Sequence, residues 1–311
     1  MVRICNKTLD KKFFQDQVLN NIHINKNSVD EKIKAILCEY PVENKETIKE
    51  WLLKVITIID LTTLSGDDTR SNVFRLCQKA ANPLKPELVK SLNLDYKIKT
   101  AAVCVYPTRV ADAYEAIKQM GLTDTIQIAS VATGFPSGLY PLQSRLLDIK
   151  YAVNNGATEI DVVLDRSLVL TGKWETLYNE LAQMRQACGE AHLKVILAVG
   201  ELGSYENVYK ASMVSMVAGA DFIKTSTGKE AVNATLPIGL VMCRAIRNFY
   251  LMTGIKVGLK PAGGIKTAKD AVNWLTLVYT ELGPEWVTPH LFRIGASSLL
   301  DVVEKKLDNC I

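Results

Sequence analysis

Short runs rich in β-branched and other apolar residues recur along the chain, and amphipathic stretches separate them. Eight such runs are visible, beginning at Val55, Ala101, Gln127, Glu159, Lys194, Asp221, Lys256 and Phe292. The stretches between them carry apolar residues at helical spacing, as in YPLQSRLLDIKYAVNNG and TLPIGLVMCRAIRNFYLMTG, and both of these end on glycine. Eight strand–helix alternations over roughly 250 residues predict an α/β fold of the closed (β/α)8 TIM-barrel type.

The chain ahead of the first predicted strand has a different character. Residues 1–50 show two polar helical patterns, DKKFFQDQVLNNIHIN and SVDEKIKAILCEYP, which we interpret as an N-terminal helical extension. Residues 51–311 then form a single barrel domain. A doubly wound open sheet is the alternative fold, but it would need a nucleotide crevice, and the sequence has no G-x-G-x-x-G or Walker motif to build one.

Charge and hydropathy narrow the possible partners. The 311 residues include 37 basic and 33 acidic ones, a net charge of +4, without a block of like charges. We therefore expect neither a nucleic acid nor a membrane partner. The longest apolar stretch, WLLKVITIIDL, is interrupted by Lys54, and the start of the chain lacks the apolar region of a secretory signal. These features predict a cytoplasmic protein.

Cysteine and histidine usage argues against disulfides and metals. The seven cysteines are an odd number, widely spaced, with no C-x-x-C pair. The three histidines, His23, His192 and His290, lie far apart and form no H-x-H or H-E-x-x-H pattern. We predict no metal and no cofactor.

Two lysines lie at the ends of neighbouring predicted strands. In DFIKTS and KVGLKPAGG, alternation of side chains lets Lys224 and Lys260 both face inward. Reactive groups of such barrels lie at the carboxyl ends of the strands, where adjacent strands are about 5 Å apart. A like charge and partial desolvation both favour a neutral amine, which is the form that attacks a carbonyl to make an imine.

An acid interrupts one of the most apolar runs. In EIDVVL, alternation places Asp161 on the face opposite Ile160 and Val162. An isolated buried carboxylate is unfavourable, so we expect a cationic partner, and Lys260 is the available one. Such a pair could pass a proton through a bound water.

Glycines and hydroxyls follow the last three predicted strands, in TSTGK, PAGGIKT and GASS. Backbone N–H groups at such loops form anion sites, and the last strands of a barrel commonly hold phosphate. The candidate residues are Gly228, Gly263, Gly264, Gly295, Ser297 and Ser298, with charge added by Lys229 and Lys266. The pattern predicts a ligand with a phosphate at one end and a carbonyl at the other.

Plainer interpretations exist for each feature. A lysine at a strand end is usually a solvated loop residue, a single acid in a strand usually lies on an exposed edge, and glycine is the default turn residue. The paired lysines, the apolar surroundings of Asp161 and the succession of the three loops favour a functional site. Cys104, in AVCVYP, reads as a packed core thiol, with reactivity the lesser interpretation.

Four segments carry a resemblance to a known family. EIDVV, DFIKTSTGK, NAT and KPAGG occur in this order, within a match from Asp60 to Leu300. The chain thereby resembles the deoxyribose-phosphate aldolases, in their longer animal-type form. The resemblance implies a class I, metal-free lyase of deoxyribonucleoside catabolism that cleaves 2-deoxy-D-ribose 5-phosphate reversibly to acetaldehyde and D-glyceraldehyde 3-phosphate.

The resemblance also implies roles for single residues. Lys224 matches the Schiff-base lysine, Lys260 the lysine that perturbs it, and Asp161 the proton-relay acid. The substrate-binding residues that it implies, including the phosphate cradle, are Asp60, Thr62, Cys104, Thr225, Gly228, Lys229, Gly263, Gly264, Gly295, Ser297 and Ser298. Family members often carry a tyrosine in a flexible C-terminal tail, whereas the last tyrosine here is Tyr279.

Two other functions remain open at this stage. A different Schiff-base barrel enzyme, such as a transaldolase-like one acting on another phosphosugar, would share the lysine and the phosphate loops. A non-catalytic sugar-phosphate-binding scaffold would bind a ligand without turnover. A homo-oligomer is possible in each case.

Overall fold

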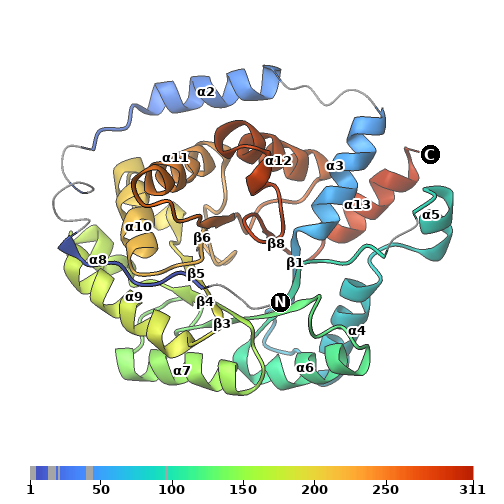
Figure 1. Ribbon diagram of the computed structural model, residues 1–311, viewed down its shortest axis with the longest axis horizontal. Coiled ribbons are helices and arrows are strands. Elements are labelled where there is room, and N and C mark those ends of the chain that lie inside the picture. Colours follow the sequence, from blue (N-terminus) through green and yellow to red (C-terminus); the bar gives the residue numbers. More distant parts are fainter. Residues whose placement is uncertain (1–4, 13–18, 20–21, 40–44, 95–96, 311) are drawn as a thin grey trace.

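Eight parallel strands form the centre of the molecule (Figure 1). The computed structural model describes residues 5–12, 19, 22–39, 45–94 and 97–310. The strands are β1 (Ile59–Thr62), β2 (Ala102–Val105), β3 (Gln127–Ala132), β4 (Glu159–Val163), β5 (His192–Ile196), β6 (Phe222–Lys224), β7 (Gly258–Lys260) and β8 (Ile294–Ala296). They are hydrogen-bonded in the order β7-β6-β5-β4-β3-β2-β1-β8.

The sheet closes between its first and last members. The backbone N–H of Arg293 donates to the carbonyl of Leu259 at 3.0 Å, and the N–H of Gly295 donates to the carbonyl of Pro261 at 2.9 Å. These bonds join β7 to β8. The predicted TIM barrel is therefore confirmed, and every strand ends at one rim.

Helices surround the barrel and connect its strands (Figure 1). They are α2 (Lys26–Glu39), α3 (Lys45–Thr57), α4 (Arg70–Ala81), α5 (Pro86–Ser91), α6 (Val110–Gln119), α7 (Leu142–Asn154), α8 (Arg166–Leu170), α9 (Trp174–Cys188), α10 (Tyr205–Val217), α11 (Leu236–Thr253), α12 (Ala268–Leu282) and α13 (Leu299–Asp308). The two helices expected from apolar spacing, α7 and α11, are both present. The glycine predicted to end α11, Gly254, adopts the left-handed conformation with φ 71°.

The N-terminal region corrects one prediction. The run expected to be the first strand, starting at Val55, belongs instead to α3 as far as Thr57, and β1 begins at Ile59. Leu52, Val55 and Ile56 are buried at helical spacing, so packing on one helix face explains their apolar character. Helix α3 also crosses the boundary proposed at residue 50, so the division into extension and barrel stays a prediction.

The two predicted N-terminal helices have different outcomes. The pattern SVDEKIKAILCEYP is confirmed by α2, which packs against α11 and α12. The pattern DKKFFQDQVLNNIHIN lies mostly outside the described residues. Ahead of it, the backbone N–H of Leu9 donates to the carbonyl of Val217 at 2.8 Å, and the hydroxyl of Tyr178 donates to the carbonyl of Leu9. This dark-blue stretch thus lies beside α9 (Figure 1).

The two faces of each strand have different surroundings. Outward residues such as Ile160, Val162 and Ile223 belong to the apolar core between barrel and helices. Inward positions carry the charged residues described below. The lower interior also holds the ring of Phe222, and any side chain at Gly258 would collide with that ring. A glycine on β7 therefore lets an aromatic ring fill the barrel beneath the charges.

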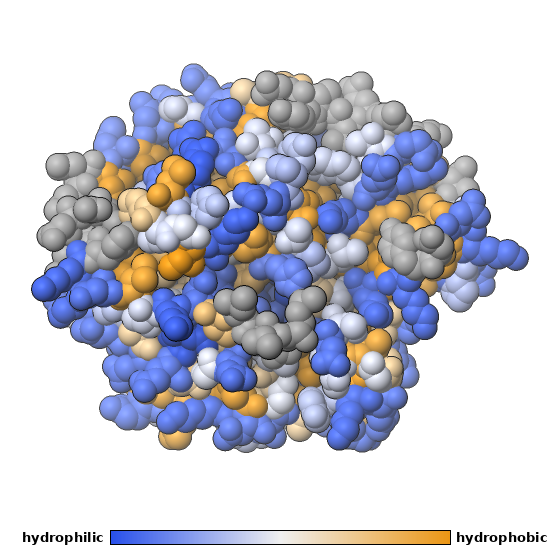
Figure 2. Space-filling model, in the orientation of Figure 1, coloured by the Kyte–Doolittle hydropathy of each residue, from blue (hydrophilic) through white to orange (hydrophobic). Residues whose placement is uncertain are grey.

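Within the described ranges, no helix combines the length and the apolar content that crossing a bilayer requires. The face drawn in Figure 2 is largely hydrophilic, with apolar side chains in separate groups.

Candidate active site

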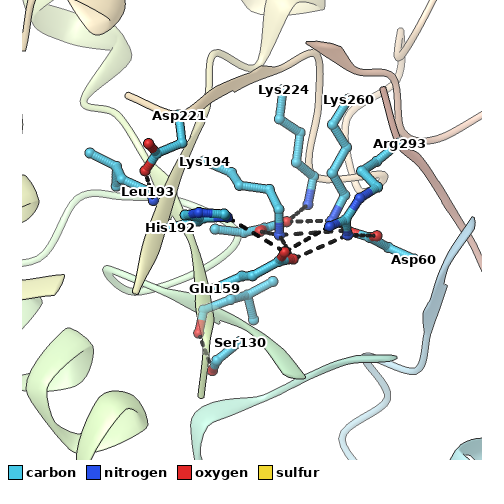
Figure 3. Close-up of polar contacts among 12 residues, drawn as sticks. Asp60, Ser130, Glu159, His192, Leu193, Lys194, Asp221, Lys224, Lys260 and Arg293 are labelled. Carbon is cyan, nitrogen blue, oxygen red and sulfur yellow. Dashed lines mark hydrogen bonds and ion pairs between the residues drawn. The ribbon is translucent and has the colours of Figure 1, made fainter. Parts of the chain in front are cut away.

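The two predicted lysines lie side by side at the rim of the barrel. Lys224 and Lys260 are the last residues of β6 and β7, and they face each other in the sheet register. Both reach the carboxylate of Asp161 on β4: Lys224 Nζ lies 2.8 Å and Lys260 Nζ 2.7 Å from the same oxygen, Oδ2. The predicted inward orientation of the two lysines is confirmed (Figure 3). The predicted contact between Asp161 and Lys260 is confirmed as well.

Further charges lie next to this trio and deeper in the barrel (Figure 3). Lys194 Nζ contacts Asp161 Oδ1 at 2.9 Å and Glu159 Oε2 at 2.6 Å. Arg293 Nη2 contacts Glu159 Oε1 at 2.8 Å, and Arg293 Nη1 contacts Asp60 Oδ1 at 2.6 Å. Lys260 also pairs with Asp60. Each acid therefore bridges at least two cations.

We call these seven residues the buried ion cluster. Its members are Asp60, Glu159, Asp161, Lys194, Lys224, Lys260 and Arg293, and none is more than 3% exposed. Four cations face three acids, so one positive charge is left without an acid of its own. Burial opposes ionisation of Asp161, but Lys194, Lys224 and Lys260 together outweigh it and hold the pKa of this carboxyl well below its usual value. The unbalanced positive charge therefore favours loss of a proton from one of the four cations.

Lys224 is the cation whose pKa is lowered. Burial is the largest cause, and the positive charge of Lys260 adds to it, while Asp161 opposes the shift. The pKa of Lys260 moves the other way: burial lowers it, but Asp161 and Asp60 outweigh burial and raise it. We expected both a like charge and desolvation to act on Lys224, and desolvation is the stronger of the two. The cluster therefore favours a neutral amine at Lys224 and a charged one at Lys260.

The other polar candidates line the same interior. Thr62 donates through Oγ1 to the carbonyl of Asp60 at 2.8 Å, and the N–H of Ala262 donates to Thr225 Oγ1 at 3.0 Å. Cys104 is fully buried beside Ala129, as expected of a packed thiol, and burial raises the pKa of its thiol. Thr225 thus ties the loop after β6 to the loop after β7, and Cys104 closes the interior on the β2 side.

The three glycine loops lie next to one another. Thr225 joins the first loop to the second at Ala262, and Ala262 pairs in turn with Gly295, just ahead of the third. Six of the candidate phosphate residues lie on these loops: Gly263 is half-buried, and Gly228, Lys229, Gly264, Ser297 and Ser298 are exposed. Gly295 was expected at a loop start but lies half-buried in β8. Ser298 immediately precedes α13, so the first turn of that helix points its N–H groups towards this rim.

Three members of the buried ion cluster were missed by sequence reasoning. These are Glu159, Lys194 and Arg293, to which the sequence analysis gives no role. The signal was available, because each is a charged residue at the inward parity of an apolar strand run, as Asp161 is. A charge at such a position predicts a partner of opposite sign on a neighbouring strand.

A second group of reactive side chains lies at the opposite end of the barrel. Cys5, His192 and Asp221 bring their ligand-type atoms within 4.8 Å of one another. The carboxylate of Asp221, however, already accepts hydrogen bonds from the backbone N–H of Asn6 and from the guanidinium of Arg185, whose charge opposes a metal cation. This group fastens the N-terminal segment to the start of β6.

Comparisons with known proteins agree with this geometry. Residues 54–305 match the model of the DeoC/LacD family aldolases. The chain is 60% identical to the deoxyribose-phosphate aldolase of Mus musculus and 58% identical to that of Homo sapiens, each over 290 residues that cover 93% of this chain and 90% of the relative. A tetrameric deoxyribose phosphate aldolase from Aeropyrum pernix has the same fold, with a TM-score of 0.64 at 21% identity, covering 93% of this chain and 100% of the other.

Proposed function

The chain belongs to the DeoC/LacD family of aldolases, and from this premise we propose that it cleaves 2-deoxy-D-ribose 5-phosphate reversibly to acetaldehyde and D-glyceraldehyde 3-phosphate. The observation that carries the proposal is the inequality of the two neighbouring lysines. Lys224 has a lowered pKa and contacts one acid of the buried ion cluster, whereas Lys260 has a raised pKa and contacts two. An amine of the first kind is suited to attack a carbonyl.

The chemistry begins at Lys224. Its neutral amine adds to the aldehyde carbon of the open-chain sugar, and loss of water gives an iminium ion. Breaking the bond between sugar carbons 2 and 3 leaves its electron pair in an enamine on Lys224, while the proton of the carbon-3 hydroxyl goes to a base. Protonation of the enamine and hydrolysis then release acetaldehyde and regenerate the amine.

Asp161 is the group best situated to handle these protons. It contacts Lys224 and Lys260 through one oxygen and Lys194 through the other, so a proton that leaves the substrate can pass to it directly or through one water. Its low pKa keeps it ionised, so it can pass a proton on but does not retain one. Lys260 stays charged and stabilises the electron-rich intermediate by attraction.

The phosphate end of the substrate fits the three glycine loops. Their backbone N–H groups, together with the first turn of α13 and the exposed side chain of Lys229, supply donors and positive charge. We propose that Gly228, Gly263, Gly264, Ser297 and Ser298 hold the phosphate there, and that Gly295, whose N–H already donates to Pro261, only borders the site. The aldehyde then lies over Lys224 beside Thr62, Cys104 and Thr225.

Product analysis tests the proposal. The protein is incubated with 2-deoxy-D-ribose 5-phosphate and, in parallel, with fructose 1,6-bisphosphate, and the aldehydes formed are identified. We expect acetaldehyde and glyceraldehyde 3-phosphate from the first substrate and no cleavage of the second. Lys224→Met should abolish the activity, and Lys150→Met, at an exposed position on α7, should retain it. Cleavage of fructose bisphosphate alone would favour a different phosphosugar, and ligand binding without turnover would indicate a scaffold.

Two further properties belong to this proposal. We propose a cytoplasmic protein with no nucleic acid and no membrane as partner, which the small net charge of +4 supports. A homo-oligomer is supported by the tetrameric relative from Aeropyrum pernix, and light scattering of the purified protein would test it.

A further inference from the structure

The loop that follows β6 turns two consecutive N–H groups towards one carboxylate. The backbone N–H of Thr227 lies 3.0 and 3.1 Å from the two carboxylate oxygens of Glu230, and the N–H of Gly228 lies 3.1 Å from Oε2. Successive N–H groups that converge in this way form an anion-binding concavity. Here a side chain of the protein itself fills it.

The loop keeps this shape through other contacts as well. Gly228 has φ 86°, a conformation that favours glycine. The N–H of Lys229 donates to Thr227 Oγ1 at 3.1 Å, and Asn233 Nδ2 donates to the main-chain carbonyl of Glu230 at 2.8 Å. None of these bonds uses the Glu230 carboxylate. The two N–H groups can therefore keep their direction when that carboxylate turns away.

The same N–H groups belong to the loop proposed to hold phosphate. Gly228 lies against Gly263 of the next loop, and Lys229 extends its Nζ to the carbonyl of Leu64, 3.4 Å away, across the rim from β1. A phosphate bound between the loops after β6 and β7 would need the donors that Glu230 occupies. Two anions cannot share these donors without strong repulsion.

Building on the proposed function, we propose that Glu230 is an internal competitor of the substrate phosphate, which occupies the N–H groups of Thr227 and Gly228 until a phosphate displaces it. A phosphate monoester carries a charge of about −1.5 to −2 at pH 7 and displaces a singly charged carboxylate. Glu230 thus weakens the binding of the phosphate end of the substrate and leaves the binding of the sugar end unchanged.

Calorimetric titration with inorganic phosphate tests this role without relying on turnover. Glu230→Gln keeps the size of the side chain and one acceptor oxygen but removes the charge. We expect the Kd for phosphate to fall about tenfold in this variant. Glu206→Gln is the matched control, because Glu206 also accepts a backbone N–H, that of Ile24, away from the three loops. An unchanged or larger Kd in Glu230→Gln would overturn the proposal.

Kinetics separates this inference from the proposed function. In Glu230→Gln the KM for 2-deoxy-D-ribose 5-phosphate should fall, whereas the KM for 2-deoxy-D-ribose, which lacks the phosphate, should stay the same. An equal fall for both sugars would contradict competition at the phosphate end. If the wild-type protein cleaves neither sugar, the aldolase proposal fails, and the calorimetric comparison still decides what Glu230 does.

Discussion

Lys224 and Lys260 end neighbouring strands and contact the same oxygen of Asp161, yet their pKa values move in opposite directions. Both are buried, so desolvation alone cannot separate them. The difference is the second acid: Lys260 also pairs with Asp60, and Lys224 has no such second partner among the described residues. The number of carboxylates around an amine, more than its burial, therefore decides which lysine can become a nucleophile.

The cations at the rim of the buried ion cluster and those deep in the barrel also differ in the number of acids that they contact. At the rim, Lys224 can lose a proton because only one acid holds it. In the depth, Arg293 bridges Asp60 and Glu159 and keeps its charge. Because the deep residues keep their charges paired, the excess positive charge of the cluster lies at the rim, beside Lys224.

Asp161→Asn should have the largest effect, because it removes the acid that both lysines share. We expect the free energy of unfolding to fall by about 3–5 kcal/mol, since buried cations lose their partner. The rate of cleavage should fall by roughly 10²- to 10⁴-fold, as for loss of an acid–base group. Urea unfolding and steady-state kinetics measure the two effects.

The control for this variant is Asp165→Asn, just beyond the same strand. Asp165 caps α8 by accepting the N–H of Ser167, and asparagine caps a helix equally well. Its stability and activity should therefore be unchanged. If Asp161→Asn unfolds like the wild type, the shared acid does not hold the cluster together.

Lys260→Met tests the inequality of the two lysines. Loss of the neighbouring charge, and closer pairing of Lys224 with Asp161, should raise the pKa of Lys224. Imine formation would then move to higher pH, and each unit of increase lowers the neutral fraction at pH 7 about tenfold. The pH profile of imine formation with acetaldehyde measures the midpoint, with Lys256→Met near the other end of β7 as control. The same midpoint in both variants would refute the assigned influence of Lys260.

Arg293→Lys should lower the free energy of unfolding and leave the pH profile of imine formation unchanged. A lysine cannot bridge Asp60 and Glu159 as the guanidinium does, so we expect a loss of about 1–3 kcal/mol in the free energy of unfolding. Lys224 makes no contact with Arg293 among the interactions of the cluster. A shifted midpoint of imine formation would show that rim and depth are not separate in function.

The effect at His192, below Glu159, is confined to the pH dependence of stability. Burial lowers its pKa, but hydrogen bonds with Cys5 and Glu159 outweigh burial and raise it to about 9. Because the pKa is higher in the folded state, the protonated imidazole of His192 stabilises the fold. This contribution is complete below pH 6.5 and is lost as the pH rises from 6.5 through about 9. We expect a decline of about 1–3 kcal/mol across this window, measured by urea unfolding, and a flatter profile in His192→Gln. Equal slopes of the free energy of unfolding against pH in the wild type and in His192→Gln would disprove this contribution.

The sequence predicted the fold and the positions of the main site residues better than the charge interactions among them. Periodicity and strand parity were sufficient for the barrel, the inward lysines and Asp161, and the family resemblance is confirmed by the comparisons. The first strand was misplaced because an amphipathic helix and a buried strand share an apolar run around Val55. Lys194 and Arg293 were missed because a single charge in a strand looks like a surface residue until its partners on other strands are known.

The most direct test of the central claim is to trap the imine and find its position. The protein is treated with acetaldehyde and borohydride, and the modified peptide is identified by mass spectrometry. The lowered pKa of Lys224 predicts a two-carbon adduct on Lys224, with Lys194 and Lys260 unmodified although they lie in the same cluster. An adduct on Lys260, or a folded protein that forms no adduct, would contradict the account.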